Sequence, residues 1–288
     1  PELRSCSDGY IHGVMLGALG GVGEGELAEA ARAICADPKL LEAISGVLSN
    51  CLHGAGHGIL SASGGVIDVA IDRCAAAFSD EPFVSDYGPI RCANGVFMEA
   101  LIPTAEDRAV ADPLDRCESI EDSGRLGELL WLCYLNAADA ASRSAALRPD
   151  PAMVERCSSV RSPYVEYCIE GALSHPSDAT ESATLVGFCE ILGDPGIPGS
   201  SAEHCLESLI ADVSIHHPED PRAIELCSIA ADRSHLLGDR GARLVECVRS
   251  YLVEVVDYWG DDGRVERICA LLDDAALVSA CRAPLPEG

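Results

Sequence analysis

Apolar residues recur at helical spacing in short segments along the whole chain, and stretches rich in proline, glycine and aspartate separate these segments. Seven segments are alanine-rich or amphipathic and end just before a cysteine; they span residues 26–34, 66–73, 105–116, 151–156, 179–188, 221–226 and 264–268. A punctuated stretch such as Asp37-Pro38 or Ser162-Pro163 follows, and then a second apolar-periodic segment that carries another cysteine. This order predicts a helix, a turn and a second helix in each case.

The cysteines form two interleaved series that follow these two kinds of segment. The first series is Cys35, Cys74, Cys117, Cys157, Cys189, Cys227 and Cys269. The second series is Cys6, Cys51, Cys92, Cys133, Cys168, Cys205, Cys247 and Cys281. A period near 40 residues with two cysteines per period predicts an all-α solenoid of α/α helical hairpins, roughly seven of them. We expect a single helical-repeat domain over residues 1–288, with a softer boundary near 145–150.

Disulfide bonds within each hairpin follow from this arrangement, because a cysteine late in the first helix lies beside one early or midway in the second. The expected pairs are Cys35–Cys51, Cys74–Cys92, Cys117–Cys133, Cys157–Cys168, Cys189–Cys205, Cys227–Cys247 and Cys269–Cys281. Each closes a loop that contributes roughly 3 kcal/mol to stability. The alternative is that the cysteines bind soft metal ions along the helices, which mass spectrometry with and without reduction would distinguish.

The repeated hairpins resemble α/α solenoids of the tetratricopeptide and Sel1-like class, including their disulfide-stapled secreted members. The resemblance is one of period and architecture. The chain does not match the Sel1 consensus, with its closely spaced glycine and tyrosine positions, and its cysteine spacing differs. The resemblance therefore implies the fold class alone.

The cysteine content also indicates a compartment. There are 15 cysteines, and no Cys-x-x-Cys pair occurs, which argues against zinc ribbons, iron–sulfur motifs and thioredoxin-type sites. Regularly spaced single cysteines fit structural disulfides in an oxidising compartment. With no signal peptide and no apolar run of transmembrane length, we expect a mature secreted or periplasmic protein without membrane insertion, whose leader is absent from this chain. A soluble ectodomain is the alternative.

The formal net charge of −27, with Lys39 as the only lysine, repels phosphate backbones, so nucleic acid is not an expected partner. Two interpretations of the charge remain. It provides solubility or adaptation to high salt, or it attracts cations.

One motif, Cys-x-x-Gly-x-x-His-Gly, occurs twice, at residues 6–13 and 51–58. The position three residues after each second-series cysteine is glycine in four of the first five cases, and we expect it to allow close helix packing; the five residues are Gly9, Gly54, Gly95, Asn136 and Gly171. The position six residues after each of these cysteines is polar or sulfur-containing, and the residues there are His12, His57, Met98, Asp139 and Ser174. Equivalent positions on successive helices are expected to stack into a row.

The histidines of this row predict a metal site. His53 lies four residues before His57, hence on the same helix face, so His12, His53 and His57 are expected to converge. Three histidines with an open position are a common catalytic or transport shell, and Met98 favours copper over zinc. Weaker candidate ligands are Met98, Glu99 and Cys6. The alternative is that the histidines are simply packed helix residues, with Gly56 and Gly58 needed for small size or backbone access.

Cys6 has no partner in the pairing scheme. Cys6 is a free thiol, or it bonds another chain, or the preceding helix of its hairpin has been removed. As a free thiol it is a candidate fourth ligand, although a residue six positions before His12 lies on a different face of the helix.

Two functions fit these patterns. The first is a secreted metal-binding protein, either a metalloenzyme or a metal carrier, with the histidine site near its N-terminal end. The second is a non-catalytic scaffold that presents an acidic concave surface to a basic protein or peptide. Haem or another small organic ligand on the same row is a third possibility.

Overall fold

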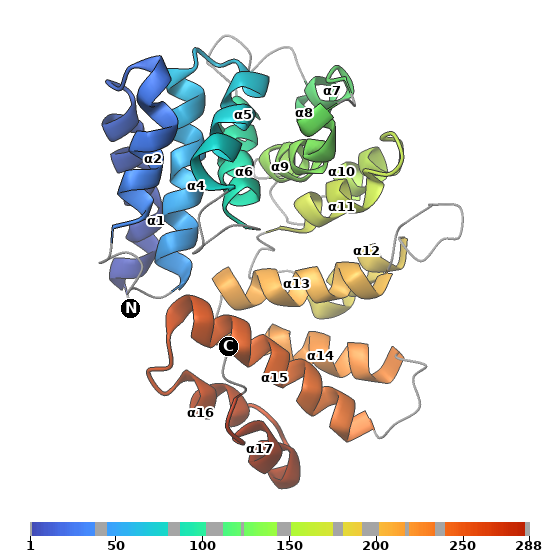
Figure 1. Ribbon diagram of the computed structural model, residues 1–288. Helices are drawn as coiled ribbons and strands as arrows, with labels where there is room; N and C mark the ends of the chain where they lie inside the picture. The colour runs from blue at the N-terminus through green and yellow to red at the C-terminus, as the bar shows by residue number, and fades with distance from the viewer. Residues whose placement is uncertain are drawn as a thin grey trace. The chain divides into compact units, whose positions relative to one another are not determined.

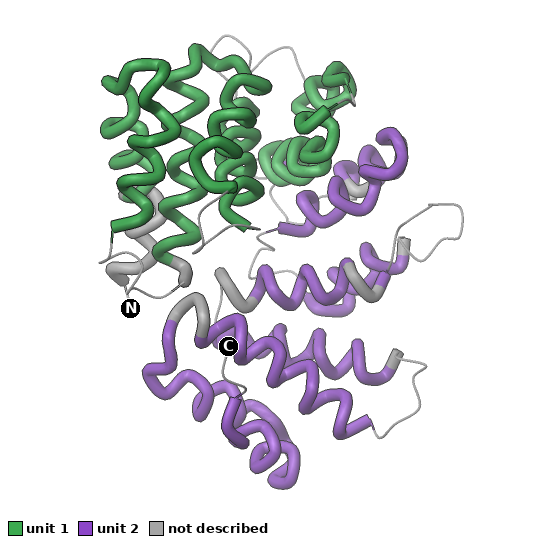
Figure 2. The backbone as a smooth tube through the Cα atoms, in the orientation of Figure 1, with its two compact units in different colours: residues 1–141 green, residues 142–288 purple. Residues whose placement is uncertain are grey.

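The computed structural model describes residues 2–37, 45–79, 87–101, 112–121, 124–142, 151–174, 181–191, 202–216, 219–233 and 240–285. Within these ranges every regular element is helical (Figure 1), so the predicted all-α class is confirmed. The described contacts divide the chain into two compact units, Pro1–Ala141 and Ser142–Gly288 (Figure 2). That division lies a few residues before the expected softer boundary. The solenoid period and the single-domain assignment stay predictions.

The helices of the first unit are α1 (Glu2–Leu19), the 3₁₀ turn η1 (Glu24–Glu26), α2 (Leu27–Cys35), α4 (Ser45–Ala62), α5 (Ile67–Phe78), α6 (Gly88–Leu101), α7 (Pro113–Glu118), α8 (Gly124–Glu128) and α9 (Leu130–Ser142). Those of the second unit are α10 (Pro151–Cys157), α11 (Val165–Leu173), α12 (Ser182–Ile191), α13 (Ala202–His216), α14 (Pro221–Arg233), α15 (Arg240–Trp259), α16 (Arg264–Cys269) and α17 (Ala275–Cys281).

The expected first helices of the hairpins are α2, α5, α7, α10, α12, α14 and α16. Amphipathic spacing accounts for α2, whose residues Leu27, Ala31 and Cys35 are all buried at four-residue intervals. An Asp-Pro pair begins α7: the Asp112 carboxylate accepts a hydrogen bond from the Leu114 backbone N–H, with Pro113 in the first turn, as expected of a capped helix start. The earlier part of the expected 105–116 segment lies outside the described residues.

Seven disulfide bonds connect the helices in the expected pairs: Cys35–Cys51, Cys74–Cys92, Cys117–Cys133, Cys157–Cys168, Cys189–Cys205, Cys227–Cys247 and Cys269–Cys281. Most bonded cysteines are fully buried. Aromatic side chains are few, at 5% of the sequence, so these bonds supplement a core built largely from Ala, Leu, Ile and Val.

Helix α4 is the centre of the first unit. It packs between α1 on one side and α6 on the other, with α2 and α5 forming a second layer (Figure 1). Every residue from Cys51 to Leu60 is buried, which is the exposure pattern of a core helix. The polar residues on this stretch, His53 and His57, are therefore inside the protein.

Helices α1, α4 and α6 run in the same direction. On α6, Met98 contacts His53 and the next residue, Glu99, contacts His57. Each of these helices carries one cysteine of the second series. In the second unit the helices that carry this series also pack in chain order, α11 against α13 and α13 against α15. No helix in the described ranges is long and apolar enough to cross a membrane.

Candidate metal centre

Glycines allow α4 and α6 to touch backbone to backbone. A Cβ atom built on Gly56 would lie 2.0 Å from the carbonyl oxygen of Cys92, and one built on Gly95 would lie 1.9 Å from the carbonyl oxygen of His53. Real Cβ atoms do not approach backbone oxygens this closely, so this packing requires glycine at both positions.

The opposite side of α4 receives α1 in a similar way. A Cβ on Gly54 would lie 3.0 Å from Met15 Cγ, and one on Gly58 would lie 2.8 Å from the Met15 carbonyl oxygen. Close packing therefore accounts for Gly56 and Gly58 as well as for Gly54 and Gly95. Gly13 of the first motif copy differs, because no atom lies within 4 Å of its ideal Cβ position.

The close approach of α1 and α4 places three histidine rings together. The ring centroids of His12 are 4.9 Å from His53 and 4.6 Å from His57, and those of His53 and His57 are 4.9 Å apart. One ring nitrogen of each histidine lies within 4.8 Å of the other two. His53 and His57 are only 6% and 4% exposed, and His12 is partly exposed. Such a cluster could hold a metal ion at the boundary between core and solvent.

Glu99 orients one of these rings. The Nδ1 atom of His57 is 2.8 Å from the Glu99 carboxylate oxygen Oε2. The N–H at Nδ1 therefore donates to Glu99, which leaves the lone pair on Nε2 of the neutral ring. That Nε2 atom faces the Nε2 atom of His53 at 3.1 Å. A carboxylate that fixes the tautomer of a ligating histidine is a recurrent feature of metal sites.

His53 sits beside a thioether and keeps one nitrogen unsatisfied. Its Nε2 atom is 3.3 Å from the Met98 sulfur. Its Nδ1 atom is buried without a hydrogen-bond partner among the described residues. The nearby Asn94 side chain favours protonation of His53, but the geometry at Nδ1 falls short of a hydrogen bond. Buried polar atoms are nearly always satisfied, so the described residues by themselves do not complete the hydrogen bonding of this ring.

Arg91 and two hydroxyls border the cluster. The Nε atom of Arg91 donates to Ser49 Oγ at 2.8 Å, and Ser49 Oγ is also 2.8 Å from the Tyr87 hydroxyl. Ser49 lies one helical turn before His53 on α4, on the same face. The guanidinium group is therefore placed at the edge of the histidines.

Two of the histidines are disposed to stay neutral. Burial, followed by the charges of His57 and Arg91, lowers the pKa of His12 from 6.5 to about 4. The pKa of His53 is lowered well below 6.5, again first by burial and then by Arg91. Metal ions bind the neutral ring, so at neutral pH these rings need not release a proton to become ligands.

These shifts predict how the metal-free protein responds to acid. The pKa of His12 is about 4 in the folded state against 6.5 as its ordinary value. The unfolded chain therefore binds the extra proton first as pH falls. The stability contributed by neutral His12 is present above pH 6.5 and is lost progressively towards pH 4, and His53 acts in the same direction.

Thermal melts in the presence of a chelator at pH 7.5, 6.5, 5.5 and 4.5 would test this prediction. A His12→Gln variant lacks the titrating group, so the difference in melting temperature between wild type and variant should shift in favour of the variant as pH falls. A constant difference over that range would contradict the prediction.

Five of the six expected site residues lie in one cluster. His12, His53 and His57 lie together, and Met98 and Glu99 contact two of them. The side chain of Cys6 lies outside the described residues. The sequence patterns do not single out Ser49, Tyr87 or Arg91, which border the cluster. The one available signal was spacing, since Ser49 precedes His53 by four residues and Arg91 precedes Gly95 by four.

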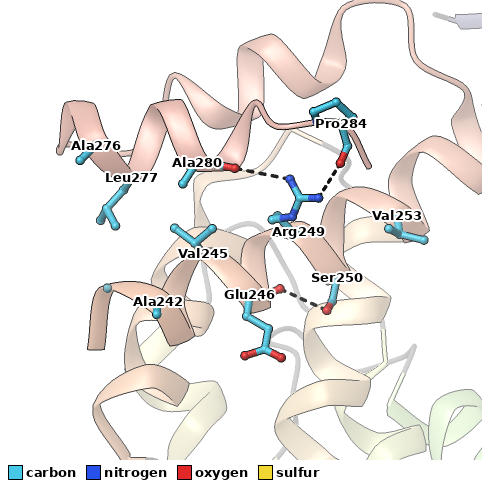
Figure 3. A pocket seen from close by; sticks show the side chains of 11 residues that line it. Ala242, Val245, Glu246, Arg249, Ser250, Val253, Ala276, Leu277, Ala280 and Pro284 are labelled. Carbon is cyan, nitrogen blue, oxygen red and sulfur yellow. Dashed lines mark hydrogen bonds between the residues drawn. The ribbon is translucent and has the colours of Figure 1, made fainter. Parts of the chain in front are cut away.

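A second feature lies in the other unit, where α15 and α17 form an open groove lined mainly by alanine, valine and leucine (Figure 3). Arg249 extends across it, but its guanidinium nitrogens donate to the carbonyl oxygens of Ala280, Ala283 and Pro284. The groove is apolar where the scaffold hypothesis calls for an acidic surface. It also lacks the convergence of titratable groups found around His53.

Comparison of the chain with protein families, curated proteins and solved structures gave no match. The functional argument therefore rests on the geometry of the histidine cluster.

Proposed function

We propose that the protein binds one transition-metal ion through His12, His53 and His57. The observation that carries this proposal is the meeting of three imidazole nitrogens, all within 4.8 Å of one another, at a largely buried place. Packing alone would not favour this arrangement, because His53 and His57 are removed from water and His53 Nδ1 has no hydrogen-bond partner among the described residues.

The spacing of the two buried rings fits shared coordination. Two imidazole nitrogens bound to one tetrahedral ion at about 2.0 Å lie about 3.3 Å apart. The Nε2 atoms of His53 and His57 are 3.1 Å apart. Only a small adjustment separates the observed arrangement from one in which both nitrogens face an ion, and Glu99 already holds the lone pair of His57 in that direction.

Copper is the metal we favour. Thioether sulfur is a soft ligand that selects Cu(I), whereas imidazole alone suits copper and zinc about equally. The Met98 sulfur lies 3.3 Å from His53 Nε2, so it is placed to act as an additional, weaker ligand. Glu99 is a positioning residue in this proposal, because its carboxylate contacts His57 at Nδ1, whereas Nε2 of the same ring faces His53.

Seven disulfides favour an oxidising compartment, so we propose a secreted or periplasmic metal protein. The overall charge of −27 supports this assignment through attraction of cations to the surface. Three protein nitrogens leave at least one coordination position available, which suits transfer of the ion to an acceptor or reaction of a bound ligand.

Elemental analysis tests the proposal. Protein produced in an oxidising compartment without a histidine tag, incubated with excess copper, zinc and iron salts and then desalted, should retain about one copper ion per chain. Retention of zinc alone would overturn the choice of metal. Absence of any stoichiometric transition metal would overturn the proposed function.

A further inference from the structure

The two ring nitrogens of His53 have different surroundings. Its Nε2 atom faces both His57 Nε2, at 3.1 Å, and the Met98 sulfur, at 3.3 Å. Its Nδ1 atom is buried and has no hydrogen-bond partner among the described residues. Nε2 is therefore the nitrogen placed to bind an ion together with His57, and Nδ1 then carries the proton of the neutral ring.

A proton on Nδ1 of a ligating histidine needs an acceptor. Histidine ligands almost always donate their second ring N–H to a carboxylate, a carbonyl group or water, and this bond fixes the tautomer. For His57 the acceptor is the Glu99 carboxylate, 2.8 Å from Nδ1. His53 is only 6% exposed, so an N–H left unpaired there would destabilise the metal-loaded protein.

Helix α6 brings an amide side chain to the His53 ring. The backbones of α6 and α4 touch at His53, because a Cβ on Gly95 would lie 1.9 Å from the His53 carbonyl oxygen. Asn94 directly precedes Gly95 and lies four residues before Met98, hence on the face of α6 whose methionine sulfur contacts His53. The amide of asparagine offers a carbonyl oxygen as acceptor, and its χ2 torsion is broad. Asn94 is therefore an adjustable acceptor next to His53.

We propose that Asn94 is the positioning residue of His53, and that its Oδ1 atom accepts the hydrogen bond from Nδ1–H when an ion binds Nε2. This inference rests on the proposed metal site. Together with Glu99, which contacts His57, Asn94 makes α6 the helix that orients both buried ligands of α4.

The two orienting groups differ in charge, which affects the oxidation state of the bound copper. A carboxylate partner raises the basicity of a ligating histidine. The neutral amide of Asn94 leaves His53 a weaker donor, and the Met98 sulfur beside it is a soft ligand that selects Cu(I). Asn94 therefore favours Cu(I) over Cu(II) at this site.

Nitrogen-15 NMR of the Cu(I)-loaded protein tests the inference, because Cu(I) is diamagnetic and the two ring nitrogens give separate signals. In the wild type, His53 should show a metal-bound Nε2 and a protonated Nδ1 whose hydrogen exchanges slowly with water. Asn94→Leu removes the acceptor, so it should bind Cu(I) about 10–100-fold more weakly and exchange the Nδ1 hydrogen faster. Asn94→Asp provides an acceptor again and should keep the slow exchange, while its charge raises the affinity for Cu(II) relative to Cu(I).

Asn136→Leu is the matched control. Asn136 is a buried asparagine on α9 of the same unit, and its amide donates to the Leu132 carbonyl oxygen within its own helix. Leucine at this position should leave the copper affinity and the His53 signals unchanged.

The outcomes separate this inference from the proposed function. Equal Cu(I) affinities of the wild type and Asn94→Leu would overturn the role of Asn94 while leaving the metal site intact, and so would a His53 that binds the ion through Nδ1. If Asn94→Leu is misfolded, Asn94→Asp decides, because an equal loss of affinity in the aspartate variant contradicts a hydrogen bond to Nδ1–H. A wild-type protein that retains no metal would overturn the proposed function and this inference with it.

Discussion

Replacement of His57 by alanine should weaken copper binding by more than about 100-fold, since loss of a residue that merely orients a ligand typically costs 10–100-fold. His57 offers the nitrogen whose lone pair is already set by Glu99, and it lies against both other rings, 4.6 Å from His12 and 4.9 Å from His53 between centroids. Competition against a chromogenic copper chelator measures the affinity, and circular dichroism verifies that the variant remains helical.

Three further variants make this measurement specific. Glu99→Gln keeps the shape but weakens orientation of the His57 ring, and should lose about 10–100-fold. Met98→Leu should reduce affinity for Cu(I) while leaving Zn(II) affinity nearly unchanged, because only the soft metal uses the sulfur. His216→Ala, on α13 of the second unit, should have no effect. Unchanged copper affinity in His57→Ala would show that the histidines are packing residues.

Replacement of Gly95 by alanine should destabilise the protein by about 3 kcal/mol or more, at the upper end of the range for overpacking. The added Cβ would lie 1.9 Å from the His53 carbonyl oxygen and 2.9 Å from its carbonyl carbon. Both are backbone atoms, so no side-chain rotation relieves the clash and α4 must move away from α6. This movement would separate Met98 from His53 and lower copper affinity as well.

Gly17→Ala is the matched control. Gly17 is also in a helix, α1, but it is exposed and has no atom within 4 Å of its ideal Cβ position. Alanine there should leave stability unchanged or raise it by up to about 1 kcal/mol, through the higher helix propensity of alanine. Denaturant unfolding with the disulfides intact compares the two variants. Equal stabilities would contradict the assigned role of Gly95 in helix contact.

The helical class and the disulfide pairs could be predicted because they depend on local features. Apolar spacing and Asp-Pro pairs locate helix starts, as at α14, which begins at Pro221 directly after Asp220. A short connection forces two consecutive helices to lie side by side, so cysteines 11 to 20 residues apart have few other partners within reach. Neither argument needs information about distant parts of the chain.

Alignment of the repeats also predicts the candidate metal ligands, but it does not predict their contacts. Alignment on the cysteines places Met98 opposite His57, because both lie six residues after a cysteine. In the structure Met98 contacts His53, and the next residue, Glu99, contacts His57. This difference changes the chemistry of the site, because the Glu99 carboxylate orients the His57 ring and the Met98 sulfur lies beside His53.

By itself, the sequence was sufficient to determine a helical chain with seven local disulfides and a set of histidines that repeat in register. The tertiary structure decided the offset of α4 along its axis relative to α6, because that offset depends on where Gly56 and Gly95 allow the two helix backbones to touch. It also decided the contact between Arg91 and Ser49, which joins α6 to α4 one helical turn before His53. Helix offset and side-chain convergence depend on close packing between segments some 40 residues apart, which no local pattern specifies.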